Sequence, residues 1–194
     1  NGRIQGVETT KGFIAAEYVV VCAGLWGRLI ANMAGEDLPI MPVDHPLTFF
    51  KPYLEFAGTG KDIGYPLLRD QGNSAYLRDT GDPKTPEGGQ IEWGYYEEKN
   101  PRMCHPRDLL EKEQARLSPS QRDLELDQIM APLERAIELT PILAELGYDD
   151  KYSFNGLLQV TTDGNPSIGE SSKVRGLWYA EAVWVKDGPG VGKI

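Results

Sequence analysis

A glycine-rich loop near the carboxyl end of the sequence has the composition of a binding loop. Residues 188–192 read Gly-Pro-Gly-Val-Gly and follow a strand-like run at 176–183. A loop of this kind at the start of a helix directs successive backbone N–H groups toward an electron-rich ligand. A lone run of glycines is weak evidence, so its meaning depends on the elements around it.

The pair Ala23-Gly24 is a second candidate for ligand contact. It ends the apolar run Tyr18–Ala23, whose consecutive valines predict a parallel strand buried on both faces, and a helical pattern follows at 25–34. Ligands of open α/β sheets bind at the carboxyl ends of strands, and glycine lets them approach the backbone closely. The alternative is a strand-to-helix turn that binds nothing.

Of the two histidines, only His45 has a setting that suggests chemistry. It lies on an expected strand at 38–50, whereas His105 lies in a loop and is expected to be structural. A neutral imidazole can accept a proton near pH 7. From residue types alone, a strand histidine that is satisfied by a backbone carbonyl remains the simpler explanation.

The middle of the chain predicts a sheet followed by helices. Strand patterns at 67–69, 75–79 and 90–96 are separated by turn-rich segments and predict an antiparallel meander. A helical period follows, with Ser118 as the expected N-cap and Pro119 at the first helical position. Pro132 and Pro141 are expected to split this region into shorter helices. These patterns place the chain in the α/β (α+β) class.

Composition excludes several functions. The 194 residues carry a net charge of -9 with a sequence pI near 4.8, which argues against nucleic acid or an anionic membrane as partner. No apolar run approaches the roughly 20 residues that cross a bilayer. Cys22 and Cys104 are isolated, so neither a disulfide framework nor a metal site is predicted.

Four segments together resemble one protein family. They are 18–27, 41–46, 67–78 and 153–193; they follow the family's order and cover just over a third of the chain. They resemble the glycine oxidase and sarcosine oxidase superfamily of flavin amine oxidoreductases. The strongest likeness is to the branch that contains dimethylglycine oxidase and the sarcosine and dimethylglycine dehydrogenases. The family's Gly-x-Gly-x-x-Gly motif does not occur in the sequence, so we expect a fragment that lacks the site for the ADP pyrophosphate.

The resemblance implies FAD as the cofactor of the intact protein. It places the strand end at 23–26, the turn at 162–166 and the loop at 188–192 near the flavin, where backbone N–H groups would stabilise negative charge on the reduced ring. The implied cofactor contacts are Ala23, Gly24, Trp26, Gly164, Gly169, Gly188, Gly190, Val191 and Gly192.

The resemblance also gives His45 and Tyr76 catalytic roles. A histidine at this position of the family's motif faces the substrate amine, and a tyrosine at the position of Tyr76 lies beside it. Lys186 is implied as a contact for the substrate carboxylate, although the dimethylglycine branch more often has Thr-His where this chain has Lys186-Asp187. That difference leaves the exact substrate open. Arg78 is a second expected substrate contact, because it lies two residues after Tyr76 and shares its side of the strand.

The implied reaction is oxidation of a small N-methylated amino acid, dimethylglycine or sarcosine. Hydride passes from the N-methyl carbon to the flavin, and hydrolysis of the resulting iminium gives formaldehyde and the demethylated amine. Two alternatives stay open: an oxidase of another amino acid, and a chain that is by itself an inert module without cofactor. The resemblance also implies a folate-binding domain in the parent chain. We expect the parent to be cytoplasmic, or in the mitochondrial matrix of a eukaryote.

The expected organisation is discontinuous. Residues 1–37 and 153–194 are expected to form part of an FAD-binding domain, and residues 38–152 a substrate-binding domain with a mixed or antiparallel sheet and helices.

Overall fold

The computed structural model describes residues 2–56, 65–80, 89–97, 99–111 and 120–193, and it has the mixed α/β architecture that the sequence predicts. The chain forms two compact units. The first unit contains residues 1–43, 103–115 and 157–194; the second contains residues 44–102 and 116–156. Residues 103–115 thus cluster with the first unit, although their sequence position suggested the substrate-binding domain.

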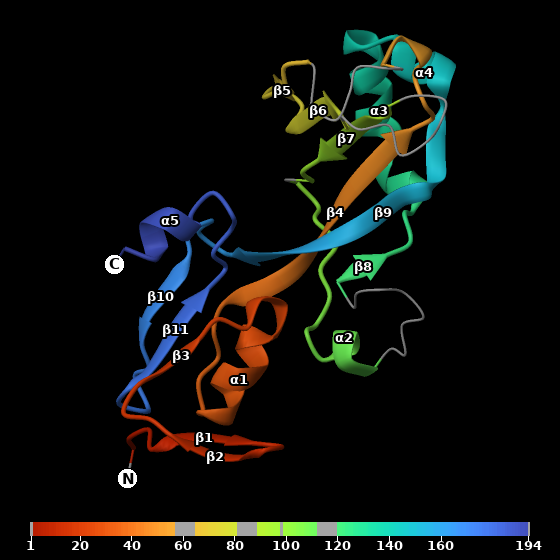
Figure 1. Ribbon diagram of the computed structural model, residues 1–194. Helices are drawn as coiled ribbons and strands as arrows, with labels where there is room; N and C mark the ends of the chain where they lie inside the picture. The colour runs from red at the N-terminus through yellow and green to blue at the C-terminus, as the bar shows by residue number, and fades with distance from the viewer. Residues whose placement is uncertain (1, 57–64, 81–88, 98, 112–119, 194) are drawn as a thin grey trace. The chain divides into compact units, whose positions relative to one another are not determined.

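A three-stranded sheet lies at the centre of the first unit (Figure 1). Its order is β10-β11-β3, with β11 parallel to β3 and antiparallel to β10. The strand bounds are Val19–Val21 for β3, Ser167–Glu170 for β10 and Leu177–Glu181 for β11. After β3, a 3-10 turn at Gly24–Trp26 leads into helix α1, Gly27–Met33. The predicted succession of strand, glycine and helix is therefore confirmed.

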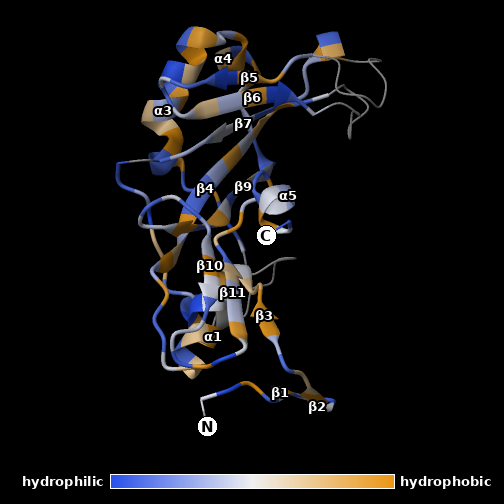
Figure 2. Cartoon of the chain, turned by 90° about the vertical axis from the view of Figure 1, so that its left-hand side faces the viewer, coloured by the Kyte–Doolittle hydropathy of each residue, from blue (hydrophilic) through white to orange (hydrophobic). Residues whose placement is uncertain are grey.

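Among the described residues, those that cover strand β3 lie on one of its faces. Val21 packs with Ala31 of α1 and with Leu177 and Tyr179 of β11. Val20 faces the other way, and its side chain is 59% exposed. Figure 2 shows that β3 is strongly hydrophobic. The expectation of burial on both faces is wrong for this chain, because the described core lies against one side of the strand.

Short elements complete the first unit. They are the hairpin of β1 (Gly6–Thr9) and β2 (Gly12–Ala15), helix α2 (Asp108–Glu111) and helix α5 (Gly188–Val191).

A six-stranded sheet, in the order β5-β6-β7-β4-β9-β8, dominates the second unit. The pairs β5–β6, β6–β7, β7–β4 and β9–β8 are antiparallel, which confirms the predicted meander. The long strands β4 and β9 contain residues of both units. The bounds are β4 Ile40–Phe50, β5 Leu68–Asp70, β6 Ala75–Asp79, β7 Ile91–Tyr95, β8 Gln121–Arg122 and β9 Tyr148–Thr161. A 3-10 turn, η2, occupies Leu54–Phe56.

Two helices pack on one face of this sheet. Helix α3 spans Leu126–Leu139 and helix α4 spans Ile142–Leu146. Pro141 precedes α4 as expected, but Pro132 lies within α3 instead of splitting it. The helix continues because Pro132 is buried in the face that packs on the sheet, and this packing offsets the lost hydrogen bond.

The start of the helical region also differs from the expectation. Ser118 and Pro119 lie outside the described residues, and the chain after them forms strand β8 before α3 begins at Leu126. In the part of the chain that the structure describes, no helix has the length and apolar character that crossing a membrane requires.

The core of the second unit lies between α3, α4 and the sheet. Its members are large apolar side chains from strands β4, β6 and β7 and from both helices: Phe50, Ala75, Ile91, Trp93, Tyr95, Ile129, Ala136 and Leu143. This packing fixes the register of the sheet, because a slip of one residue would expose the whole apolar set.

Candidate active site

One face of the second unit's sheet carries His45 and Tyr76. His45 lies on β4 and Tyr76 on β6, with β7 between the two strands. The register pairs Tyr76 with Gly94 of β7, and Gly94 with Leu47 of β4. Side chains alternate along a strand, so His45 shares a face with Leu47 and therefore with Tyr76. The opposite face packs on α3.

The side chain of Tyr76 reaches across β7 to contact His45. Nε2 of His45 and the hydroxyl oxygen of Tyr76 lie 3.0 Å apart, and the imidazole tautomer decides which of them donates the hydrogen bond. A Cβ atom at Gly94 would lie 2.1 Å from Cζ of Tyr76 and 2.3 Å from its hydroxyl oxygen. Gly94 is therefore required for the phenol ring to lie over the strand.

Both members of this pair are uncharged near neutral pH. Burial lowers the pKa of His45 to about 4, against a smaller opposing effect of the Tyr95 backbone, and the positive charge of Arg69 lowers this pKa further. Burial also raises the pKa of Tyr76 to about 12. The pair can therefore exchange hydrogen bonds with a ligand without placing a fixed charge beside it.

Tyr96 and Arg69, which lie outside the site residues that the resemblance implies, complete this cluster. The Tyr96 ring stacks on His45, with centroids 4.4 Å apart, and lies 5.8 Å from the Tyr76 ring. Cζ of Arg69 lies 5.2 Å from the Tyr96 centroid and 6.0 Å from the Tyr76 centroid. Arg69 stands opposite Tyr76 in the register of β5 and β6, and that pairing is the signal that could have found it.

The two expected contacts for a substrate carboxylate both have partners. Nε of Arg78 lies 2.7 Å from Oε1 of Glu92 on the neighbouring strand. This ion pair raises the pKa of Arg78. Nζ of Lys186 lies 2.6 Å from Oδ1 of Asp187. Arg78 belongs to the second unit and Lys186 to the first.

In the first unit, two buried side chains hold the carboxyl ends of β3 and β11 together. The N–H of Ala23 donates to Oε1 of Glu181, at 2.8 Å. The Gln159 amide donates to the carbonyl of Gly24, and its Oε1 accepts from the N–H of Ala182. Burial raises the pKa of Glu181, which favours its protonated form. The end of the valine strand is thereby fixed to the segment that leads into the glycine loop.

The backbone at this place adopts uncommon conformations. Gly24 has φ of +55°, and Ala182 has φ of +54° although it carries a side chain. Residues other than glycine rarely occupy this region, so the surrounding hydrogen bonds must hold Ala182 there.

The glycine loop is joined to the same point. Nε1 of Trp184 donates to the Gln159 carbonyl at 2.7 Å, just before the loop begins. The loop forms the single helical turn α5, in which the N–H of Gly188 already donates to the Trp184 carbonyl. A Cβ at Gly188 or Gly190 would meet nothing within 4 Å, so this backbone is open. A Cβ at Gly192 would lie 3.2 Å from the Gly188 carbonyl oxygen, and Val191 is half-buried.

The Asp-Gly segment forms the expected turn. Oδ1 of Asp163 accepts hydrogen bonds from Thr161 and Asn165, and Gly164 has φ of +73°. Strand β10, with Gly169 opposite Tyr179 of β11, follows this turn. The turn and β10 thus belong to the sheet that contains β3.

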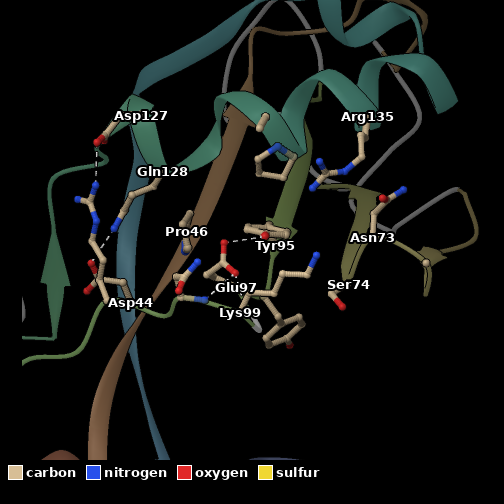
Figure 3. Close-up of a pocket in the computed structure, with 16 residues that line it drawn as sticks. Asp44, Pro46, Asn73, Ser74, Tyr95, Glu97, Lys99, Asp127, Gln128 and Arg135 are labelled. Atoms are coloured by element: carbon tan, nitrogen blue, oxygen red, sulfur yellow. Dashed lines mark hydrogen bonds and ion pairs between the residues drawn. The ribbon is translucent and has the colours of Figure 1, made fainter.

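A cavity of about 640 Å³ lies in the second unit beside α3 (Figure 3). Several of its charged groups are paired within the chain: Arg122 lies 3.2 Å from Asp44, and Arg102 lies 2.8 Å from Asp127. Tyr96 borders the cavity, which therefore adjoins the aromatic cluster.

Comparison with known proteins identifies the class of this molecule. The whole chain, residues 1–194, matches the family model described as DAO, FAD dependent oxidoreductase. The chain therefore belongs to the FAD-dependent oxidoreductase family, and the resemblance inferred from its sequence is confirmed. The cofactor of this family is FAD.

Within this family, the chain is similar to dehydrogenases of N-methylated amino acids. The chain is 28% identical over 174 residues to a mitochondrial dimethylglycine dehydrogenase from Mus musculus. The aligned region covers 90% of this chain and 19% of that relative. It is 27% identical over 176 residues to a mitochondrial sarcosine dehydrogenase from Homo sapiens. Here the aligned region covers 91% of this chain and 17% of that relative. The chain thus spans less than a fifth of the length of these relatives.

A solved structure shares the fold. An L-proline dehydrogenase from P. horikoshii superposes with a TM-score of 0.61 at 22% sequence identity, covering 99% of this chain and 47% of that one.

The strand end in the first unit fits a cofactor such as FAD. Nε1 of Trp26 is buried and has no hydrogen-bond partner among the described residues. Gly24 is exposed and has no side chain to keep a ligand from its backbone. A buried donor without a partner costs free energy unless a bound group supplies an acceptor. Ala23, Gly24, Trp26 and the open glycines of α5 are the residues that would hold such a group.

Proposed function

We propose that this chain is part of an FAD-dependent oxidoreductase that oxidises an N-methylated amino acid such as dimethylglycine or sarcosine. The observation that carries the proposal is the uncharged pair His45 and Tyr76, joined at 3.0 Å on the face of the sheet that is turned away from α3. Similarity to dimethylglycine and sarcosine dehydrogenases supports the substrate class. In this proposal the second unit binds the amine and the first holds the flavin.

The chemistry requires the amine in its neutral form. The substrate carbon releases hydride only when the nitrogen lone pair can form the C=N bond of an iminium. FAD, when bound, supplies the acceptor for the hydride and its two electrons. An uncharged imidazole and phenol can accept a hydrogen bond from the N–H of the substrate ammonium before that group is deprotonated, and they add no positive charge that would oppose the developing iminium.

Water completes the reaction. It adds to the iminium carbon, and the adduct breaks its C–N bond to release formaldehyde and the amine with one methyl group fewer. Tyr96, which stacks on His45, shields one side of the pair and offers an aromatic surface to the methyl groups.

Turnover of the intact protein that contains this chain tests the proposal. We expect dimethylglycine or sarcosine to yield formaldehyde in equal amount to the amine consumed. Tyr76→Phe removes the phenol oxygen and should lower kcat/KM by about 100-fold, the effect typical of a lost proton-transfer or hydrogen-bonding group. Tyr152→Phe, in the same unit, is the matched control, since Tyr152 contacts Lys151 instead of His45. Absence of formaldehyde with every N-methylated amino acid would contradict the proposal.

The alternative substrate, another amino acid, draws support from Lys186-Asp187, a pair that differs from the pattern common in the dimethylglycine branch. A panel of primary and secondary amino acids assayed by flavin bleaching separates the two. Release of ammonia without formaldehyde would favour the alternative.

We also propose that the chain by itself does not retain FAD, because its sequence contains no Gly-x-Gly-x-x-Gly motif for the pyrophosphate. Purified chain should lack the visible flavin absorbance bands. A yellow preparation with one flavin per chain would overturn this expectation.

A further inference from the structure

We infer that Arg69 binds the substrate carboxylate, a role that rests on the proposed function and that neither Arg78 nor Lys186 fills. Arg69 lies on β5 directly opposite Tyr76. Its Cζ stands 6.0 Å from the Tyr76 centroid, while the hydroxyl at the far end of that ring contacts His45. A ligand that lies along Tyr76 therefore meets the hydrogen-bonding pair at one end and the guanidinium at the other.

The guanidinium of Arg69 is available for a ligand. Among the residues that the structure describes, no carboxylate lies within ion-pair distance of it. Within the described part of the chain, the Arg69 side chain makes one hydrogen bond, and it is long: 3.5 Å from Nε to Oε1 of Gln71. Arg69 is exposed, so its remaining N–H donors face solvent. A planar fork of donors matches the two oxygens of a carboxylate.

Arg78 is less suited to this role. Its Nε is bound to Glu92, whose side chain is only 12% exposed. Drawing Arg78 to a ligand would leave a largely buried carboxylate without its partner, which is costly. Lys186 is likewise bound to Asp187.

The two tyrosines position Arg69. Tyr96 and Tyr76 both lie under the guanidinium, and a cation over aromatic faces is held without losing its outer hydrogen-bond donors. The effect of Arg69 on the pKa of His45 shows that the cation also acts electrostatically on the catalytic pair. The cluster thus selects a short ligand with an amine near His45 and Tyr76 and an anionic group near Arg69.

Kinetics of the intact holoenzyme test the inference. Arg69→Ala should raise KM for dimethylglycine or sarcosine by about 10- to 100-fold, the range for a lost charged hydrogen bond, with a smaller effect on kcat. Its kcat/KM for dimethylamine, which has no carboxylate, should stay within about twofold of the unmodified enzyme. Arg69→Lys should restore part of the affinity, because it keeps the charge but not the fork. Lys151→Ala is the matched control: it removes a cation from the face of Tyr152 elsewhere in the unit.

A binding measurement separates failure of the inference from failure of the proposed function. Acetate titrated into the holoenzyme should perturb the flavin spectrum, and Arg69→Ala should raise the acetate Kd by a similar factor whatever amino acid the enzyme oxidises. Equal losses with dimethylamine and with the amino acid would indicate a structural role and overturn the inference. An unchanged acetate Kd and an unchanged KM would also overturn it. Lack of activity toward every N-methylated amino acid, with Arg69-dependent acetate binding intact, would defeat only the proposed substrate.

Discussion

The two units present their candidate contacts by different means. In the first unit the surface at the end of β3 is backbone, at Gly24 and in α5, and Gln159 and Glu181 hold it in shape from within. In the second unit the contacts are side chains, and the backbone contributes only the space at Gly94. Substitutions in the first unit should therefore act by breaking the hydrogen bonds that hold the ends of β3 and β11. Substitutions in the second unit should act by displacing the Tyr76 ring.

The largest effect is expected from Glu181→Ala in the first unit. It leaves the N–H of Ala23 without its acceptor and opens a cavity at a side chain that is 1% exposed, so we expect a loss of about 3 to 4 kcal/mol in the free energy of unfolding. Urea denaturation followed by circular dichroism measures it.

Glu181→Gln is the matched variant, because it keeps an acceptor for Ala23. The raised pKa of Glu181 means that the folded state retains a proton which the unfolded state releases, so its contribution to stability is present below pH 4.5 and lost as the pH rises through the folded-state value. Glu181→Gln should therefore gain stability relative to the unmodified chain as the pH increases. A constant difference at all pH values would show that the fold does not raise the pKa of Glu181.

Gly94→Ala is the corresponding change in the second unit. The new Cβ would occupy the space of the Tyr76 ring, and we expect a loss of about 2 kcal/mol of stability together with loss of the hydrogen bond to His45. In a Tyr76→Ala background the same change should cost little. A double-mutant cycle measures this coupling, and equal costs in both backgrounds would refute the steric explanation.

Acid should destabilise the two units in successive pH ranges. Burial lowers the pKa of His45 from 6.5 to about 4. Between these pH values the imidazole is protonated in the unfolded state and neutral in the folded state, so the second unit loses stability as the pH falls through this range. Glu36 of the first unit accepts hydrogen bonds from Ser171, Ser172 and Tyr179, which lower its pKa from 4.5 to about 2. Its contribution is lost as the pH falls between those two values.

Hydrogen exchange read on peptides of each unit checks this order. His45→Gln should remove the loss in the higher range without affecting the first unit, and Glu36→Gln should do the reverse in the lower range. Exchange that accelerates together in both units at a single pH would contradict the separate origins.

The smallest effect concerns the ion pair between Arg78 and Glu92. Arg78→Ala leaves a largely buried carboxylate alone, while the guanidinium itself is partly exposed, so we expect a loss of about 1 kcal/mol. Adding Glu92→Gln should recover most of it, as measured by thermal unfolding. Failure to recover would mean that Arg78 stabilises the sheet through packing of its aliphatic part.

Much of the fold was predictable because local patterns specify it. The valine run before Gly24, the antiparallel meander and the Asp-Gly turn are each specified by adjacent residues. Pro132 was misjudged, since burial against the sheet, a long-range effect, outweighs its local preference. The one-sided cover of β3 was missed for a similar reason: a sequence pattern does not show which neighbours are present to cover a face.

The candidate site was predictable only in part. His45 and Tyr76 came from family resemblance, whereas Tyr96 and Arg69 depend on the register of β5, β6 and β7, which no local pattern specifies. Glu181 and Gln159 were missed because a polar residue in a strand pattern is usually exposed. These two are buried and bonded to the backbone of residues 23–24, which follow β3. Gly94 did carry a signal, since a glycine inside a strand often marks a close approach.

Because the Tyr76 ring occupies the space that Gly94 leaves, substitutions at these two positions should be coupled in evolution. A lineage that acquires a larger residue at 94 must shorten the residue at 76 or abandon the contact with the imidazole, and neither change is favourable alone. Glycine at 94 and tyrosine at 76 should therefore be inherited together, and sequences that have lost one should have lost the other.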